Sequence, residues 1–194
     1  GGNNSKLRSA GRPVPGTEVK IVDEDGNKVA TGDVGEICAR GMGAMQGYWR
    51  LQDQTAATLV DGWVHTGDGG YMDDDGFIFI ADRMKDMIVT GGENVFSAEV
   101  ESAISTHGAV AEVAVIGIPD DTWGEAVHAI IVPKEGMTPN TVEIVEHCRP
   151  LIANYKLPRS IELRADPLPL SGAGKVLKRD LRAPFWEGKA RQVN

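Results

Sequence analysis

The sequence lacks several features that mark particular classes of protein. Its two cysteines, Cys38 and Cys148, stand far apart and outside any C-x-x-C pattern. We therefore expect two reduced, half-buried thiols, and neither a disulfide framework nor a thiolate metal site. No apolar run approaches the roughly 18 residues that span a bilayer, and residues 1–10 are polar where a signal peptide has its apolar segment. These absences predict a soluble, cytoplasmic protein.

Several catalytic signatures are also missing. The four histidines show neither an i, i+4 pairing nor H-E-x-x-H, and no G-x-S-x-G elbow occurs, so zinc and serine hydrolases lack support. Residues 171–176 (SGAGKV) look like a phosphate loop but fail the Walker A pattern, because Pro169 and Val176 stand where Gly and Ser/Thr are needed. Lys175 remains a candidate for neutralising a phosphate. The alternative is an exposed lysine that opens a helix.

Basic residues are scarce in most of the chain. The formal net charge is −8, from 20 basic and 28 acidic residues. From Ser171 onward six basic residues face two acidic ones, giving +4 and leaving −12 for residues 1–170. An acidic body argues against non-specific nucleic-acid binding, whereas a short basic end fits a compact anion such as a phosphate or a nucleotide. An ordinary solvated helix end is the alternative.

Residues 13–81 have the pattern of a β-rich segment. Short β-branched and apolar runs are separated by Asp-Gly turn signals. Strands are predicted at 17–22, 36–40, 63–65, 70–72 and 77–81, with a short helix near 53–59. The run of three aspartates at 73–75 lacks the ligand spacing of an EF-hand, so a solvated turn is expected there.

The pattern after residue 82 mixes helices and strands. A helix is predicted over 97–108, with Ser97 as its N-cap. A second helix should begin near Asn140 and bury Val142, Ile144 and Val145. Pro150, which lacks a backbone donor, should end or kink it. Strands are predicted at 112–118, 126–133 and 160–164, and a last helix at 176–182. The whole chain is therefore predicted to be α+β, with a β-rich first part and a small α+β second part.

Three further segments are candidates for binding. Asp68 lies among glycines directly after a predicted strand, where its carboxylate could accept hydrogen bonds from the vicinal hydroxyls of a ribose. Asp82-Arg83 stands where the β-rich pattern ends and fits either a salt-bridged corner or a hinge. Gly91-Gly92 precedes the predicted helix and could present backbone N–H groups. Turn formation alone would also explain the glycines.

Nine motifs occur in order along the chain: 11–16 (GRPVPG), 35–37 (GEI), 47–49 (GYW), 62–68 (GWVHTGD), 82–88 (DRMKDMI), 91–95 (GGENV), 123–125 (WGE), 155–158 (YKLP) and 174–178 (GKVLK). Together they resemble the adenylate-forming enzymes, which include acyl-CoA synthetases, luciferases and peptide-synthetase adenylation domains. The resemblance covers nearly the whole chain and matches the C-terminal third to two-fifths of the family. Residues 89–96 (VTGGENVF) look most like the medium- to long-chain acyl-CoA synthetases.

The resemblance implies roles for four residues in the first half-reaction, in which a carboxylate and ATP give acyl-AMP and pyrophosphate. Asp68 would bind the ribose hydroxyls, and Arg83 would help to hold the same ribose and phosphate. Asp82 would be the hinge on which the C-terminal domain swings. Lys175 would be the catalytic lysine that bridges the substrate carboxylate and the α-phosphate.

The resemblance also implies a second half-reaction, in which the thiol of coenzyme A displaces AMP. After domain rotation, Gly91, Gly92 and Glu93 would line the tunnel for pantetheine. The implied substrates and cofactors are ATP, Mg²⁺, coenzyme A and a fatty or other medium-to-long acyl acid, with neither a protein-bound metal site nor nucleic acid. A lipid substrate would also bring peripheral contact with a membrane.

The implied organisation is a fragment of a longer enzyme. Residues 1–81 would be the last, β-rich subdomain of the AMP-binding large domain, 82–83 the hinge, and 84–194 the mobile C-terminal domain. In relatives the phosphate loop, the segment that binds magnesium ATP and the acyl pocket precede residue 1. The fragment is expected to be inactive without that N-terminal part of the same chain.

Two other functions remain open from the sequence. A peptide-synthetase adenylation domain is disfavoured because no carrier-protein segment appears in the roughly twenty residues after Lys175. A stand-alone module that binds a nucleotide or coenzyme A would need no catalytic partner, and it predicts tight ATP binding by the isolated chain.

Overall fold

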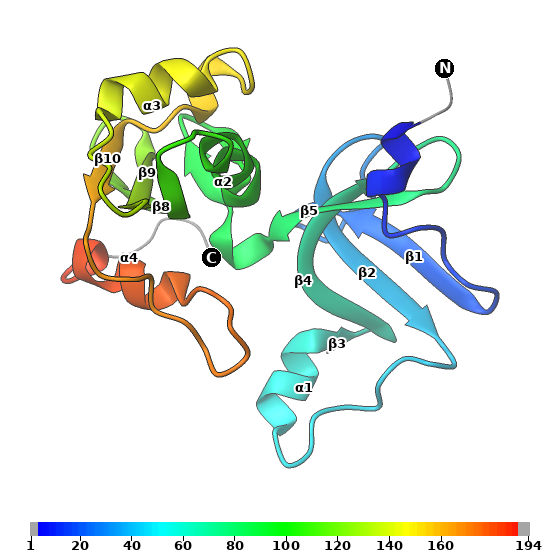
Figure 1. Cartoon of the computed structure of the whole chain (residues 1–194). Helices are drawn as coiled ribbons and strands as arrows, with labels where there is room; N and C mark the ends of the chain where they lie inside the picture. Colours follow the sequence, from blue (N-terminus) through cyan, green and yellow to red (C-terminus); the bar gives the residue numbers. More distant parts are fainter. Residues whose placement is uncertain (1–3, 190–194) are drawn as a thin grey trace. The chain divides into compact units, whose positions relative to one another are not determined.

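A computed structural model describes residues 4–189, which fold as two compact units. Unit 1 is Gly1–Met84 and unit 2 is Lys85–Asn194. The predicted α+β class is confirmed, since the chain combines helices with two largely antiparallel sheets (Figure 1). Within the described part of the chain, no helix combines the length and apolar character needed to cross a bilayer.

Unit 1 is built on a five-stranded antiparallel sheet in the order β1-β2-β4-β3, with β5 also paired to β4. Its elements are η1 (Asn4–Arg8), β1 (Thr17–Val22), β2 (Gly35–Gly41), α1 (Gln52–Thr58), β3 (Leu59–Val60), β4 (Trp63–Met72) and β5 (Ile78–Arg83). The predicted strands at 17–22 and 36–40 and the helix near 53–59 are confirmed. For the two strands, local β-branched residues and turn signals had indicated the element.

Strand β4 is continuous, so the prediction of two strands, 63–65 and 70–72, with a loop between them is wrong. The strand passes through Gly67, whose φ is +70°, and its pairing with β5 shifts register between Gly69 and Gly70. Because β2 pairs along one edge of β4 and β3 and β5 along the other, the ladder holds the glycines in the strand. Figure 1 shows the resulting curvature of β4.

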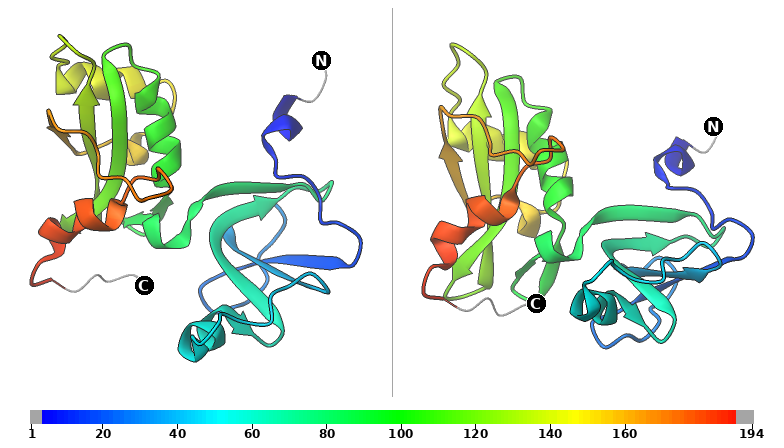
Figure 2. Two further views of the ribbon diagram at one scale, coloured as in Figure 1. Left: turned by 60° about the horizontal axis from the view of Figure 1, so that its bottom comes forward. Right: turned by 90° about the horizontal axis from the view of Figure 1, so that it is seen from below.

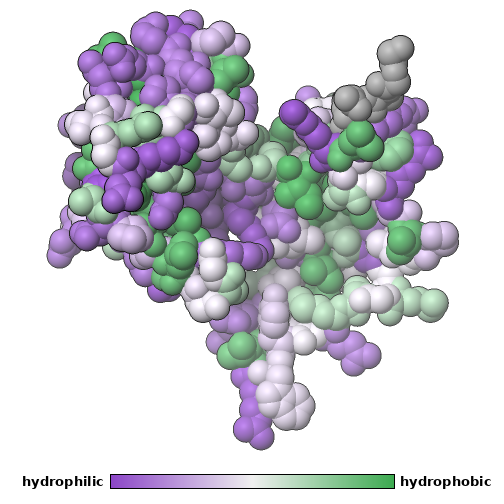
Figure 3. Space-filling model, viewed as in Figure 1, coloured by the Kyte–Doolittle hydropathy of each residue, from purple (hydrophilic) through white to green (hydrophobic). Residues whose placement is uncertain are grey.

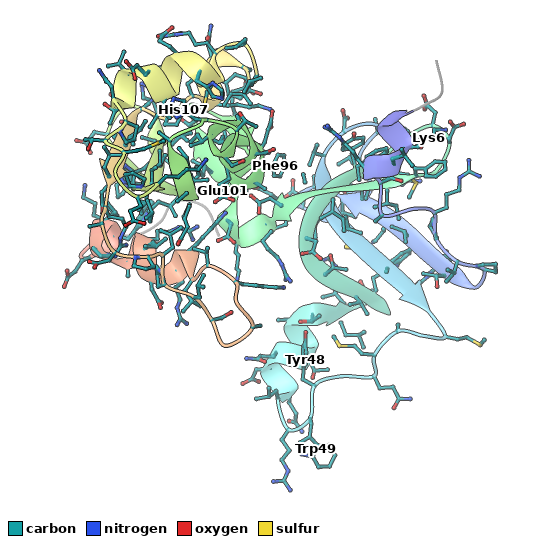
Figure 4. The ribbon with its side chains drawn as sticks, viewed as in Figure 1. Lys6, Tyr48, Trp49, Phe96, Glu101 and His107 are labelled. Carbon is teal, nitrogen blue, oxygen red and sulfur yellow. The ribbon has the colours of Figure 1, made fainter. Side chains whose placement is uncertain are left out.

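Unit 1 has a small core for its size. Among its described residues, the buried hydrophobic ones are Ile21, Val22, Ile37 and Cys38. Hydrophobic side chains also lie at the surface, interspersed with hydrophilic ones (Figure 3). Trp49 is 84% exposed and projects from the loop before α1, as Figure 4 shows.

Unit 2 is built on a second five-stranded sheet in the order β10-β9-β6-β7, with β8 also paired to β9. Strand β10 is parallel to β9 and the other pairs are antiparallel. The elements are η2 (Met84–Asp86), β6 (Ile88–Thr90), β7 (Glu93–Val95), α2 (Ser97–Ser105), β8 (Val110–Asp120), β9 (Gly124–Pro133), α3 (Thr141–Cys148), η3 (Asn154–Lys156), β10 (Ser160–Leu163) and α4 (Lys178–Trp186).

Helices cover both faces of the unit 2 sheet (Figure 2). Alternate residues of β8 and β9 point to opposite faces, as strand geometry requires. Val115 and Ile131 pack in the cluster that includes residues of α2 and α3, whereas Ile116 and Ile130 pack in the cluster that includes Leu181 of α4. Burial on both faces therefore explains why these two strands have near-continuous apolar sequences.

Some helix details differ from the prediction. The N-cap of α2 is Phe96 and not Ser97, which is the first helical residue. Helix α3 does begin after Asn140, whose side chain accepts a hydrogen bond from Val142 N at 2.9 Å, and it ends before Pro150. Ile144 is buried as predicted, but Val142 is 64% exposed.

The last helix is α4, which lies later in the sequence than the predicted 176–182. Leu181 and Phe185, spaced i, i+4, both pack on the sheet, so burial of this apolar face extends the helix past Pro184. The hairpin of β6 and β7 was not predicted. Its strands have three residues each, too few to show a period in the sequence.

Candidate functional site

In unit 1, Asp68 of β4 and Arg83 of β5 form an ion pair. The two residues face each other in the strand register, and Arg83 Nε lies 2.9 Å from Asp68 Oδ1. The backbone beside Asp68 is anchored, because Thr66 Oγ1 accepts a hydrogen bond from Asp68 N at 3.1 Å and donates one to Ile37 O at 2.7 Å. The predicted position of Asp68 in a loop after a strand is corrected, since the residue lies inside β4.

The Asp68–Arg83 pair remains accessible to solvent. The side chains are 31% and 52% exposed, respectively. An exposed pair of this kind stabilises a fold by only about 0–1 kcal/mol. Together the two side chains place a carboxylate, which can accept hydrogen bonds from hydroxyl groups, next to a guanidinium, which can bind a phosphate.

Asp82 lies at the end of β5, beside Arg83. It faces Gly69 in the register, and its Oδ1 accepts a hydrogen bond from Arg83 N at 2.8 Å. The division between the two compact units falls between Met84 and Lys85. The predicted hinge residue is thus two positions before that division.

In unit 2, Gly91 and Gly92 form the turn between β6 and β7. Their φ angles are +61° and +83°, a region that disfavours side chains. Gly91 N donates a hydrogen bond to Trp123 O at 2.9 Å, and a Cβ on Gly91 would lie 2.6 Å from the Trp123 ring. Glu93 is exposed at the start of β7. The turn therefore presents backbone and one carboxylate to solvent, beside an indole ring.

Trp123, Arg159 and Asp120 lie around this turn, and none of them was among the predicted site residues. The Arg159 guanidinium lies 4.8 Å from the centre of the Trp123 ring. Asp120 Oδ1 accepts hydrogen bonds from Trp123 N and Thr122 N, and these bonds hold the pKa of Asp120 below its ordinary value. Trp123 belongs to one of the nine motifs, but nothing in the sequence distinguished Arg159.

Lys175 stands at the end of a tight turn. Ser171 N donates to Lys175 O and Gly174 N donates to Ser171 O, both at 2.8 Å, and Lys175 N donates to Ser171 Oγ at 3.2 Å. Leu170 and Val176 form a β-bridge that closes the turn. The segment 171–176, which looked like a phosphate loop in the sequence, is therefore a closed, hydrogen-bonded turn. The Lys175 side chain is exposed at the end of the turn, as a lysine that meets an anion must be.

The helix that follows Lys175 is anchored by a cation that the sequence did not single out. Lys178 Nζ lies 2.7 Å from Glu101 Oε1 and 2.6 Å from Ser97 Oγ, both on α2, where Figure 4 labels Glu101. Glu101 Oε1 also accepts a hydrogen bond from Val115 N of β8 at 2.8 Å. The start of α4 is therefore fixed three residues after Lys175.

The second anchor of α4 is Arg182. Its Nη2 lies 3.1 Å from Asp86 Oδ1, and its Nη1 donates to Lys85 O at 3.2 Å. Both side chains of this pair are largely buried. Two of the basic residues that gave the tail its positive charge therefore have structural contacts within unit 2.

A separate cluster in unit 1 contains Glu36, Cys38 and His65. The imidazole Nδ1 lies 2.6 Å from Glu36 Oε2 and 3.5 Å from Cys38 Sγ. Burial, together with the Glu36 charge, raises the pKa of the Cys38 thiol to about 11. No local sequence pattern indicated this cluster, because the cysteine and the histidine are 27 positions apart.

The predicted site residues thus lie in three places. Asp68, Arg83 and Asp82 are neighbours in unit 1, Gly91, Gly92 and Glu93 share one turn of unit 2, and Lys175 stands on another turn of unit 2.

These elements correspond to two parts of the AMP-binding enzyme family. Residues 1–49 match the family described as AMP-binding enzyme, and residues 99–175 match the AMP-binding enzyme C-terminal domain. The chain belongs to this adenylate-forming family and corresponds to its C-terminal portion.

Among individual relatives, a fatty acid–[acyl-carrier-protein] ligase from Streptomyces coeruleorubidus is 46% identical over 98% of this chain and 36% of its own length. A medium/long-chain-fatty-acid–CoA ligase from Mycobacterium tuberculosis is 44% identical over 98% of this chain and 34% of its own. The chain spans about a third of the length of these curated relatives.

Solved structures show the same correspondence. The o-succinylbenzoate CoA synthetase from Bacillus subtilis, in complex with its acyl-adenylate intermediate, superposes with a TM-score of 0.85 at 35% identity. That match covers 98% of this chain and 37% of the synthetase. The same synthetase in complex with ATP and a magnesium ion has a TM-score of 0.82 at 36% identity, over 92% of this chain and 36% of its own.

Proposed function

We propose that this chain is the C-terminal part of an ATP-dependent, AMP-forming acyl-CoA synthetase that acts on a fatty or other medium-to-long acyl acid. The observation that carries the proposal is the 44% identity to a medium/long-chain-fatty-acid–CoA ligase over 98% of the chain. In the first half-reaction, a carboxylate oxygen attacks the α-phosphorus of ATP and pyrophosphate leaves. In the second, the thiol of coenzyme A attacks the acyl carbon and AMP leaves.

Asp68 and Arg83 are the proposed nucleotide-binding pair. The Asp68 carboxylate would accept hydrogen bonds from the ribose hydroxyls, and Arg83 would hold the same ribose and the phosphate. The 2.9 Å ion pair supports this role, because each group orients the other while both stay partly exposed. The solved synthetases with bound ATP or an acyl-adenylate make a nucleotide the appropriate ligand.

Lys175 is the proposed catalytic residue of the adenylation step. Attack of an anionic carboxylate on an anionic phosphate needs positive charge where negative charge develops, and a lysine supplies it as a compact point charge. The closed turn and the Lys178 anchor support this role, because they fix the backbone from which the long side chain extends. Mg²⁺ would contribute by neutralising charge on the ATP phosphates.

Gly91, Gly92 and Glu93 are proposed to line the tunnel for pantetheine, and Asp82 to be the hinge. The positive φ angles of the two glycines let a ligand approach the backbone closely, which a tunnel wall requires. The position of Asp82 two residues before the division between the units supports the hinge. Residues 1–81 and 84–194 would then be the last subdomain of the large domain and the mobile domain.

The remainder of the large domain is the proposed partner of unit 1. The small core of unit 1, together with exposed apolar residues such as Met42 and Trp49, supports a further apolar contact surface. The complete enzyme would bind ATP, Mg²⁺, coenzyme A and the acid. We propose a cytoplasmic location, with membrane contact only through a lipid substrate.

A second candidate for the acyl acceptor is an acyl carrier protein. The relative with 46% identity is a fatty acid–[acyl-carrier-protein] ligase. This alternative keeps the adenylation half-reaction and changes only the molecule that carries the thiol. Comparing coenzyme A with a phosphopantetheinyl carrier protein as acceptor would distinguish the two.

Replacing Lys175 by alanine in the full-length protein tests the proposal. We expect loss of acyl-AMP formation, measured as fatty-acid-dependent ATP–pyrophosphate exchange, while thioester formation from supplied acyl-AMP is retained. Lys134→Ala is the matched control, because Lys134 is an exposed lysine of unit 2 outside the candidate site. Equal loss in both half-reactions, or no loss in either, would contradict the role of Lys175.

A further inference from the structure

The Glu36, Cys38 and His65 side chains of unit 1 place three different metal-ligating atoms at one point of the sheet. Cys38 of β2 and His65 of β4 are direct partners in the register, and Glu36 lies two residues before Cys38 on the same strand. Their ligand atoms all lie within 4.8 Å of one another. The register shift between Glu36 and Cys38 occurs at this position, and such shifts redirect side chains.

We propose that Glu36, Cys38 and His65 form a binding site for a thiophilic divalent cation, with Zn²⁺ as the expected ion. The ligand atoms would be Cys38 Sγ, His65 Nδ1 and a Glu36 carboxylate oxygen, and water would complete a tetrahedron. Thiolate and imidazole ligands favour zinc, whereas Mg²⁺ and Ca²⁺ prefer sets of oxygen atoms.

The distances fit this geometry with a small adjustment. A tetrahedral zinc ion with ordinary bond lengths separates sulfur from nitrogen by about 3.6 Å and nitrogen from oxygen by about 3.3 Å. Cys38 Sγ and His65 Nδ1 are 3.5 Å apart, which already fits. His65 Nδ1 and Glu36 Oε2 are 2.6 Å apart, so the glutamate side chain would move back by roughly 0.7 Å to admit the ion.

The surroundings of the cluster also suit a metal site. Gly67 N donates a hydrogen bond to Glu36 Oε1 at 2.9 Å, which orients the carboxylate as outer partners of metal ligands commonly do. Cys38 is fully buried, while the side chains of His65 and Glu36 are 24% and 21% exposed. An ion would therefore enter past the imidazole and the carboxylate. The proton of the Cys38 thiol would leave to solvent, and the imidazole would bind through Nδ1 as the neutral tautomer with its proton on Nε2.

Cobalt titration of this chain tests the site directly. The purified protein is reduced, freed of metal with a chelator and titrated with Co²⁺ alone, and Zn²⁺ is then added. We expect one equivalent of Co²⁺ to give the ultraviolet thiolate-to-cobalt charge-transfer band and the intense visible bands of four-coordinate cobalt. Zn²⁺ should abolish both. The proposal would be overturned if the wild-type protein binds no Co²⁺, or if it binds Co²⁺ without a charge-transfer band.

Two cysteine variants provide a matched comparison. Cys38→Ser should lose the charge-transfer band and weaken Co²⁺ binding by more than about 10-fold. Even the loss of a residue that only hydrogen-bonds to a metal ligand lowers metal affinity by about that factor. Cys148→Ser removes the other fully buried thiol, in α3 of unit 2, and should keep both the band and the affinity. An equal effect of the two variants would refute the assignment.

Glu36→Gln keeps the proposal testable if Cys38→Ser does not fold, as judged by far-ultraviolet circular dichroism. Glutamine retains an oxygen that can accept the Gly67 hydrogen bond, and the thiolate band should persist while Co²⁺ affinity falls. Unchanged affinity would exclude the carboxylate as a ligand. Because no nucleotide enters these experiments, their outcome is independent of the proposed synthetase function.

Discussion

Replacing Lys178 by methionine should destabilise unit 2 by about 2 kcal/mol, because the lysine neutralises a largely buried carboxylate. Lys178 Nζ contacts Glu101 Oε1 at 2.7 Å and Ser97 Oγ at 2.6 Å. The Lys178 and Glu101 side chains are only 13% and 22% exposed. Methionine has a similar length and keeps the packing of the aliphatic stem, so the charge is the main loss.

The magnitude follows from the degree of burial. Exposed ion pairs contribute about 0–1 kcal/mol, whereas removing one partner of a fully buried pair costs about 3–5 kcal/mol. The Lys178–Glu101 pair lies between these limits, and Glu101 would keep its hydrogen bond from Val115 N. A loss of about 2 kcal/mol corresponds to a fall of roughly 8 °C in Tm for a unit of this size.

Urea unfolding combined with hydrogen exchange at the Val115 amide measures this effect locally. That amide belongs to β8, so it reports on unit 2 even if unit 1 unfolds separately. Arg179→Met is the control, because the Arg179 side chain is 89% exposed and its pair with Asp180 should contribute almost nothing. The double variant Lys178→Met/Glu101→Gln should recover much of the loss, because glutamine removes the charge and keeps an oxygen that can accept the Val115 hydrogen bond.

Two results would refute this reasoning. One is a Lys178→Met variant within about 0.5 kcal/mol of the Arg179→Met control, since surface substitutions have effects of that size. The other is a double variant that is less stable than Lys178→Met alone. Either would mean that Glu101 is solvated well enough to need no cation.

Three further predictions concern the stability of the fold. Burial lowers the pKa of His128 below its ordinary 6.5, so the unfolded chain binds a proton more readily than the folded one. The free energy of unfolding should therefore fall as pH drops below about 6.5. In urea titrations at several pH values, His128→Asn should show a smaller dependence of this free energy on pH. Gly35→Ala should lower the free energy of unfolding by about 1–3 kcal/mol, because its Cβ would lie 2.2 Å from a backbone oxygen of β1. Gly43→Ala is the control in thermal unfolding and should be near neutral, because a Cβ there would have no atom within 4 Å. Ile104→Ala should cost about 2–5 kcal/mol by denaturant unfolding, since the side chain is fully buried between α2 and the sheet; a loss below 1 kcal/mol would contradict that packing.

The sequence by itself determined the local elements and the family. The strands at 17–22 and 36–40 and the helix after Asn140 were predictable, because alternation, turn residues and capping residues act between neighbours in the chain. The ordered motifs likewise indicated adenylate-forming enzymes, and they selected Asp68, Arg83 and Lys175 as candidates before any geometry was available.

Only the tertiary structure decided which of these groups meet. The sequence pattern predicted a break at 66–69, but pairing on both edges keeps β4 continuous, so Asp68 lies opposite Arg83. Lys178 and Ser97 are 81 positions apart, and Cys38 and His65 are 27 apart. Such contacts depend on sheet register and on the docking of helices, which are set by the packing of the whole unit and leave no periodic trace in the local sequence.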